Sequence, residues 1–161
     1  PHITRIRIHT RLPVVIPQRL TAKLASVLSS TRLDAAIVLH INHHQEISVT
    51  LQEKLKIYRA QGIWLFNQSV LLRGVNDTVA CLTTLSEQLF RAGILPYYIH
   101  QLDRVAGAAH FEVPEENARL IMQGLLEELP GFLVPKWVRE IGGERSKTPL
   151  ALFQEATSHN A

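Results

Sequence analysis

The sequence predicts an α/β fold with parallel strands, built from units in which a strand is followed by a helix. Two observations predict this class. Strand-like and helix-like segments alternate along the 161 residues, which is typical of parallel strands joined by right-handed crossover helices. Residues 35–42 (AAIVLHIN) form a nearly continuous apolar run, as expected of a buried parallel strand. An open doubly wound sheet and a segment of a barrel both agree with this pattern.

Five segments are predicted as strands. Residues 3–10 (ITRIRIHT) alternate apolar and polar side chains, and such alternation indicates a strand with one buried face. Pro135 lies inside the last segment, so that segment is expected to be an edge strand or an irregular one. The predicted strands are residues 3–10, 35–42, 63–72, 96–102 and 132–141.

Four helices are predicted between these strands. Leucines at 20, 24 and 28 give the first helix its apolar stripe. Gly62 and Gly93 are the expected stops of the next two helices, and Asn76 with Asp77 is the expected cap of the third. The predicted helices are about residues 18–30, 48–61, 76–92 and 114–129, and residues 153–161 are expected to form a flexible tail after a domain of residues 1–152.

Polar or charged residues stand at or just past the end of each predicted strand. In barrels this rim is where the active site is built, so the pattern favours a barrel, although strand ends are also polar because they meet water. About five strands do not close an eight-stranded barrel, so either the barrel is partial or the chain is a fragment. The rim residues are His9, His40 with Asn42, Asn67 with Gln68, Asp103, and Glu140.

The composition is that of an ordinary globular domain, with 46% hydrophobic and 19% charged residues. No apolar run is long enough to span a bilayer, and the first residues do not form an export signal. We therefore expect a cytoplasmic protein that binds no membrane. The net charge of +3 is spread along the chain rather than clustered, which argues against a nucleic-acid partner. Cys81 is the only cysteine, and we expect it to be a small buried side chain.

Lys147 lies in the most suggestive loop, residues 142–149 (GGERSKTP). The glycine pair permits a tight turn or a close approach to a ligand. A lysine behind such a turn can form an imine with a carbonyl cofactor when desolvation or a nearby cation lowers its pKa. The loop is not a Walker A motif, because the first glycine of that motif is missing. An ordinary exposed loop lysine is the alternative.

Asp103 and Glu140 are carboxylates at the ends of neighbouring predicted strands. They can bind a cationic substrate group, act as an acid and a base, or bind a metal. Arg104 follows Asp103, so a surface ion pair is the alternative interpretation.

His40, His43 and His44 lie close together in the sequence. Their spacing differs from that of a helical HExxH site, so we expect polar lining or packed histidines and no metal site in this chain. If the strand continues through Asn42, His40 and Asn42 share one of its faces.

Several segments together resemble the lysine 2,3-aminomutase family, whose members are radical S-adenosylmethionine (SAM) enzymes that also use pyridoxal phosphate (PLP). The resemblance covers nearly the whole chain in the family's order. It is carried by RLPVVIPQRLT (11–21), HINHHQEI (40–47), NQSVLLRGVNDT (67–78), PYYIHQLD (96–103), HFEVP (110–114) and VPKWVREIGGERSKTPL (134–150). The closing EIGGERSKTPL is most similar to the branch that supplies (R)-β-lysine for elongation factor P, to which a partner synthetase attaches it.

The resemblance implies the C-terminal part of a radical SAM partial barrel that converts (S)-α-lysine to (R)-β-lysine. Lys147 matches the lysine that binds PLP covalently. Asp103 and Glu140 match the acidic pair that binds the ε-ammonium group of substrate lysine. His40 and Gln68 match positions near SAM.

Four departures from the family pattern bear on these roles. Glu140 stands where most members have aspartate, and residues 142–146 replace a run of glycines. Thr78 stands where longer members place a zinc-binding cysteine, so we expect neither that zinc nor that dimer. The family's CxxxCxxC loop, which ligates a [4Fe–4S] cluster, has no match in this chain. We therefore expect the upstream half of the barrel to supply the cluster, and the chain alone to be inactive.

Two other functions stay open on the sequence. A PLP-dependent racemase or lyase on a barrel would need no cluster. A folded piece without catalysis would act as an interaction module, and its open strand edge should then pair with a partner.

Overall fold

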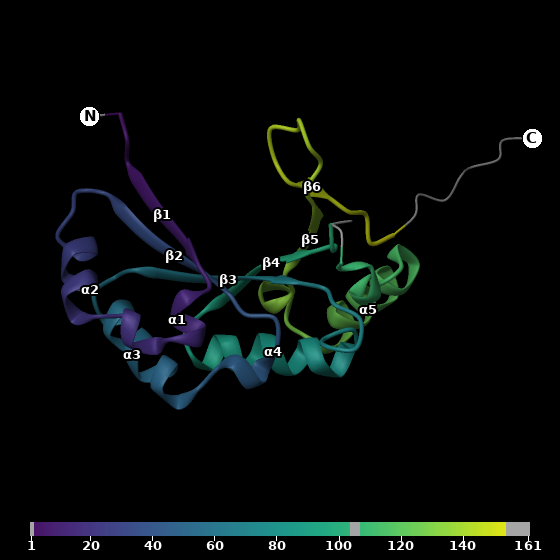
Figure 1. The fold of residues 1–161 in the computed structure, drawn as a ribbon, viewed down its shortest axis with the longest axis horizontal. Coiled ribbons are helices and arrows are strands. Elements are labelled where there is room, and N and C mark those ends of the chain that lie inside the picture. Colours follow the sequence, from purple (N-terminus) through teal and green to yellow (C-terminus); the bar gives the residue numbers. More distant parts are fainter. Residues whose placement is uncertain (1, 104–106, 154–161) are drawn as a thin grey trace, which may run out of the picture.

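The computed structural model describes residues 2–103 and 107–153. Its centre is a six-stranded sheet in the order β1-β2-β3-β4-β5-β6 (Figure 1). The first five strands are parallel, and β6 pairs antiparallel with β5. The predicted α/β class with parallel strands and crossover helices is therefore confirmed. The strands are β1 (Arg5–Thr10), β2 (Asp34–His40), β3 (Trp64–Val70), β4 (Leu95–His100), β5 (Lys136–Arg139) and β6 (Thr148–Pro149).

Helices α1 to α4 lie on one side of the sheet, whereas the loop before β6 rises on the other side (Figure 1). Ile37 and Leu39 of β2 belong to the core on the helix side, together with Leu51 and Leu55 of α3. The helices are α1 (Leu12–Val15), α2 (Ala22–Ser29), α3 (Val49–Ala60), α4 (Val79–Arg91) and α5 (Glu115–Glu128), with 3₁₀ turns η1 (Pro17–Arg19), η2 (His44–Glu46), η3 (Ala109–Phe111) and η4 (Gly131–Leu133).

Two predicted helix starts are wrong, and in both cases a threonine caps the helix. The helix expected from residue 18 begins at Ala22, because the Thr21 side chain accepts a hydrogen bond from the Leu24 amide. The Thr78 side chain likewise caps α4 by accepting from the Cys81 amide. Both caps satisfy a helix-terminal N–H group that would otherwise lack a partner.

The last predicted strand is also corrected. Residues 131–133 form η4, and Pro135 directly precedes the short strand β5. This strand is not at the edge, because Val138 and Arg139 pair with Pro149 and Thr148 of β6. The two-residue strand β6 escaped prediction because it is too short to show an alternating pattern.

Three asparagines, Asn67 inside β3 and Asn42 and Asn76 after strand ends, bond the backbone and connect strands and loops instead of lining a site. Asn67 is buried on the helix side, where its amide group bonds the N–H and the C=O of Ile41, both at 2.9 Å. Asn42 accepts a hydrogen bond from the Val70 amide at 2.9 Å. Asn76, predicted as a helix cap, is fully buried. The rim prediction was therefore wrong for Asn42 and Asn67.

Asn76 joins the loops that follow β2 and β3. Its side-chain NH₂ group donates to the carbonyls of Asn42 (2.8 Å) and Val70 (2.9 Å), and its Oδ1 accepts from the Leu72 amide (2.7 Å). Buried backbone groups that lose such partners keep their desolvation cost. Asn76 therefore fixes the relative positions of these two loops.

Within residues 2–103 and 107–153, no helix is both long and apolar enough to cross a membrane. Most of the tail predicted at residues 153–161 lies outside the described residues, so the predicted domain boundary stays a prediction.

We predict that Asn76→Ala lowers the free energy of unfolding by about 2–4 kcal/mol, because it leaves three partly buried backbone groups without their partners. Urea denaturation followed by circular dichroism measures this change. Asp77→Ala is the control, since it removes the neighbouring side chain and none of these bonds. Equal losses in both variants would show that Asn76 is not the connection between the loops.

Candidate active site on the open face of the sheet

The side of the sheet opposite the helices, called here the open face, carries a polar row across three strands. His40 of β2 pairs in register with Gln68 of β3, and Gln68 pairs with Tyr98 of β4. Side chains of directly paired residues in a sheet lie on the same face. Because Ile37, Leu39 and Ile99 face the helices, the alternation of side chains places His40, Gln68 and Tyr98 on the open face.

An irregularity in the pairing of β3 with β4 brings an extra aromatic side chain to this face. Asn67 pairs with Pro96 whereas Gln68 pairs with Tyr98, so Tyr97 is a bulged residue. The ring centroids of Tyr97 and Tyr98 are 3.9 Å apart, and Phe66 lies 5.4 Å from Tyr97. The open face therefore combines an aromatic region on β3 and β4 with the polar row.

The hairpin of β5 and β6 holds Lys147 over this row. Gly143 has φ +90°, which L side chains rarely adopt, and the turn is closed by a hydrogen bond from the Glu144 amide to the Ile141 carbonyl. The chain then returns so that Lys147 forms an ion pair with Glu140. The Lys147 ammonium also lies 5.7 Å from the centre of the Tyr98 ring.

The Lys147–Glu140 pair differs from an ordinary surface ion pair in one respect. The Lys147 side chain is only 24% exposed, while that of Glu140 is 56% exposed. The hydrogen bond and the charge of Lys147 hold the pKa of Glu140 below its usual value. Glu140 is therefore ionised at neutral pH and remains partly accessible to a second cation.

His100 lies next to this pair at the end of β4. Its Nδ1 atom is 3.9 Å from Glu140 Oε1, and its buried Nε2 atom has no hydrogen-bond partner within the described residues. Burial lowers the pKa of His100, as does the Lys147 charge, while the Glu140 and Asp103 carboxylates act in the opposite direction. The imidazole is thus held neutral among charged neighbours.

His9 and His40 complete the set of histidines on the open face, with ring centroids 6.0 Å apart in an edge-to-face arrangement. Burial is the main cause that lowers the pKa of each imidazole, and the Lys147 charge contributes to both shifts. Gln68 lies close enough to His9 to favour the protonated imidazole. Two atoms on this face, His40 Nε2 and Gln68 Oε1, are buried and have no hydrogen-bond partner among the described residues. They are available to a polar ligand.

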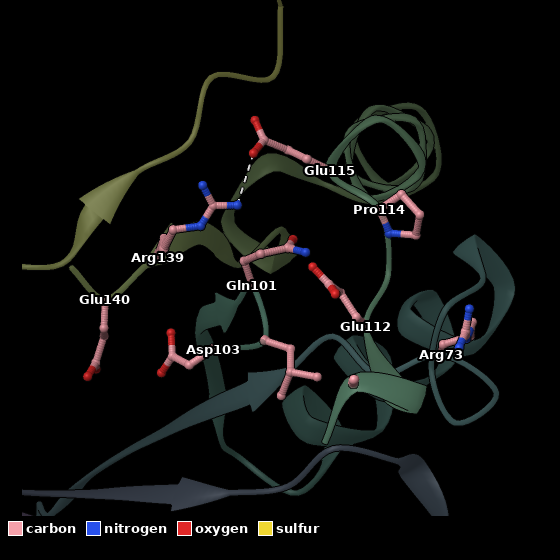
Figure 2. Close-up of a pocket in the computed structure, with 10 residues that line it drawn as sticks. Arg73, Gln101, Asp103, Glu112, Pro114, Glu115, Arg139 and Glu140 are labelled. Atoms are coloured by element: carbon pink, nitrogen blue, oxygen red, sulfur yellow. Dashed lines mark hydrogen bonds and ion pairs between the residues drawn. The ribbon is translucent and has the colours of Figure 1, made fainter. Parts of the chain in front are cut away.

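A pocket of about 790 Å³ lies beyond the ends of β4 and β5 (Figure 2). Asp103 and Glu140 lie on the same side of it, and Arg73 lies across it (Figure 2). Arg139 is held by Glu115 at 2.9 Å. Gln101 is buried beneath the pocket, where it donates to the Val113 carbonyl and accepts from the Trp137 indole.

The structure thus brings the predicted residues Lys147, Glu140, Asp103, His40 and Gln68 to one end of the open face. Sequence reasoning missed Tyr98 and His100. Both lie inside a segment that was correctly predicted as a strand, and they alternate with the buried Ile99. This alternation was the available signal, because it places both side chains on the face away from the core.

Comparison with known proteins gives close sequence relatives. The chain is 53% identical over 152 residues to the L-lysine 2,3-aminomutase of Escherichia coli (strain K12), covering 94% of this chain and 44% of that protein. It is 50% identical to the L-lysine 2,3-aminomutase of Haemophilus influenzae (92% and 44% covered) and 37% identical to that of Clostridium subterminale (93% and 36% covered). The chain spans somewhat less than half the length of these relatives. No protein-family model matches the chain.

A solved structure supports the fold. The crystal structure of a radical SAM methyltransferase from Sphaerobacter thermophilus aligns with a TM-score of 0.57 and 15% sequence identity, over 76% of this chain and 39% of that one. This likeness confirms the predicted fold, a mostly parallel sheet with crossover helices that matches part of that enzyme's structure. Together with the sequence relatives, it identifies the chain as a relative of the lysine 2,3-aminomutases that resembles their C-terminal half.

Proposed function

We propose that this chain forms the substrate- and PLP-binding part of a lysine 2,3-aminomutase that converts (S)-α-lysine to (R)-β-lysine. The observation that carries the proposal is the placement of the Lys147 amine against Glu140 on the open face. This placement occurs in a chain whose relatives are named L-lysine 2,3-aminomutase.

Lys147 has the surroundings that a PLP-binding lysine needs. Its side chain is only 24% exposed, the amine lies near the Tyr98 ring, and a buried unpaired nitrogen of His100 is nearby. An aromatic side chain suits a flat pyridine ring, and the unpaired imidazole suits a polar substituent. The described residues therefore fit PLP, with Lys147 as its covalent attachment point.

Glu140 is proposed to exchange one cation for another. While Lys147 is a free ammonium group, it neutralises Glu140. Covalent use of the Lys147 nitrogen would replace the ammonium group, which has three N–H donors, by an imine with at most one, and so weaken its pairing with the carboxylate. Asp103 lines the same pocket, so the two carboxylates then offer two negative charges to the ε-ammonium group of substrate lysine. This grip on the far end of the substrate sets which of its carbons faces the reacting centre.

His40 and Gln68 are proposed to lie near SAM, because their buried polar atoms lack partners among the described residues. The one cysteine of the chain cannot ligate a [4Fe–4S] cluster, so the cluster ligands must come from another segment. When bound, SAM with the cluster supplies the radical that removes a hydrogen atom, and PLP holds the migrating amine. The residues of this chain orient the substrate, balance its charge and exclude water.

The upstream half of the barrel is proposed to pair with the free edge of β1. Within the described residues β1 pairs only with β2, and an unpaired strand edge is a template for another strand. Without that half, we still predict no turnover.

Supply of (R)-β-lysine for elongation factor P and its lysine-attaching synthetase, and a cytoplasmic location, also stay predictions. A PLP-dependent racemase is disfavoured by the names of the sequence relatives.

We predict that Lys147→Ala abolishes covalent PLP attachment, because Lys147 is the amine that the β5–β6 hairpin places over the open face. A fusion of the upstream segment of the Escherichia coli relative to this chain is incubated with PLP and reduced with borohydride, and peptide mass spectrometry locates the adduct. Lys136→Ala is the matched control, since Lys136 lies on β5 of the same hairpin and should not alter the adduct. An adduct that persists in Lys147→Ala would remove Lys147 from its role.

Glu140→Gln in the same fusion is predicted to weaken lysine binding by roughly 10- to 100-fold, the effect of losing a hydrogen bond to a charged group. PLP affinity should change by less than about threefold, because the proposed role of Glu140 is toward the substrate. Isothermal titration with each ligand measures both quantities. Glu144→Gln, in the exposed part of the same loop, is the control. Equal losses for lysine and PLP would assign Glu140 a structural role instead.

We predict that the free energy of unfolding decreases at acidic pH, because the folded chain keeps the His100 imidazole neutral. The unfolded chain binds a proton on this side chain near its ordinary pKa of 6.5, whereas the folded pKa is lower. The unfolded state therefore takes up more protons below pH 6.5, and the free energy of unfolding decreases as the pH falls through that range. Urea denaturation at a series of pH values should show a weaker dependence in His100→Gln. An unchanged dependence would contradict the burial of a neutral His100.

A further inference from the structure

A second cluster of metal-binding side chains lies apart from Lys147 and its neighbours. His43, His44 and Cys81 each offer one ligand atom, and these atoms all lie within 4.8 Å of one another. His43 and His44 belong to the loop after β2, and Cys81 lies in the first turn of α4. Because η2 packs against α4, residues far apart in the sequence meet there. All three side chains are partly buried.

The backbone that carries these side chains is held in place before any ion binds. The Glu46 carboxylate accepts hydrogen bonds from the amides of Asn42 (2.8 Å) and His43 (2.9 Å). Asn76 fixes the same loop through the Asn42 carbonyl. Thr78 caps the helix turn of Cys81. A preorganised set of ligands loses little conformational freedom on binding, which favours a tight site.

His44 has an unused lone pair. Its Nδ1 atom is buried and has no hydrogen-bond partner within the described residues, a state that costs free energy. The ring centroids of His43 and His44 are 4.1 Å apart. The neutral imidazole is the form that binds a metal.

The other two side chains make only weak hydrogen bonds in the metal-free chain. The Cys81 thiol donates to the Val75 carbonyl at 3.7 Å, and His43 Nδ1 accepts from the Gln45 amide at 3.3 Å. The thiol proton must leave Cys81 for solvent as the ion binds, because the thiolate is the form that ligates a metal. The Glu46 bonds keep the loop in place as the ion binds.

We propose that His43, His44 and Cys81 bind one zinc ion, with water as the fourth ligand. Two imidazoles and one thiolate are a ligand set that zinc prefers. Longer family members place a zinc-binding cysteine at the position of Thr78, which is not one of these three residues, so the proposed site differs from theirs. The proposal revises the prediction that the chain holds no metal. Zinc binding here does not depend on the proposed aminomutase function.

Cobalt reports this site directly, because Cys81 is the only cysteine of the chain. Titration of the metal-free 161-residue chain with Co²⁺ should produce a near-ultraviolet sulfur-to-cobalt absorption band that saturates at one ion per chain. Zn²⁺ should then displace the cobalt and abolish the band. Cys81→Ser should lack the band, and His44→Ala should bind Zn²⁺ about 100-fold more weakly or worse, given that even outer partners of a metal ligand matter 10- to 100-fold. His110→Ala is the matched histidine control and should behave like the unchanged chain.

A second measurement needs no variant and covers the case in which Cys81→Ser does not fold. Zn²⁺ should protect Cys81 of the native chain from alkylation, as read by intact-mass spectrometry, and Mg²⁺ should not. A folded chain with no cobalt–sulfur band, or with alkylation unaffected by Zn²⁺, would overturn the proposal. Equal zinc affinity in His44→Ala and His110→Ala would do the same.

Discussion

The coverage of a parallel sheet on only one face is the constraint on which the rest of the structure depends. A parallel sheet that is buried on both faces has strands that read as continuous apolar runs, and it binds ligands beyond its strand ends rather than on a face. Here the helices bury one side through residues such as Ile37, Leu39 and Ile99. The alternate positions are thereby free to carry His40, Gln68, Tyr98 and His100. The same alternation that builds the core therefore builds the site.

The β5–β6 hairpin gives this open face its reactive group. The turn at Gly143 sends the chain back over the sheet, so Lys147 reaches Glu140 from the other arm of the hairpin. Each side chain compensates the charge of the other, and each is proposed to take a new partner during function, the amine a carbonyl cofactor and the carboxylate an ammonium group. The energetic cost of separating the pair is moderate, because Glu140 is more than half exposed.

Sequence patterns predicted those parts of the fold that depend on local periodicity. The first four strands and the order of the helices followed from alternation and from the glycine stops. The helix starts at Thr21 and Thr78 were missed, since several residues near each start can cap a helix and packing selects one. Asn67 and Asn42 were assigned to the rim by position alone, but their side chains bond the backbone. The pairing of Lys147 with Glu140 depends on β6. This strand has only two residues, too few to show an alternating pattern in the sequence.

If the open face is where the cofactor binds, a structure of the cofactor-bound protein must show it there. The decisive measurement is a crystal structure of the fusion with the upstream segment, reduced with borohydride in the presence of PLP. We expect a pyridoxyl group bonded to Lys147 on the side of the sheet away from α1 to α4. A pyridoxyl group on another lysine, or on the helix side, would contradict the proposed role of the open face.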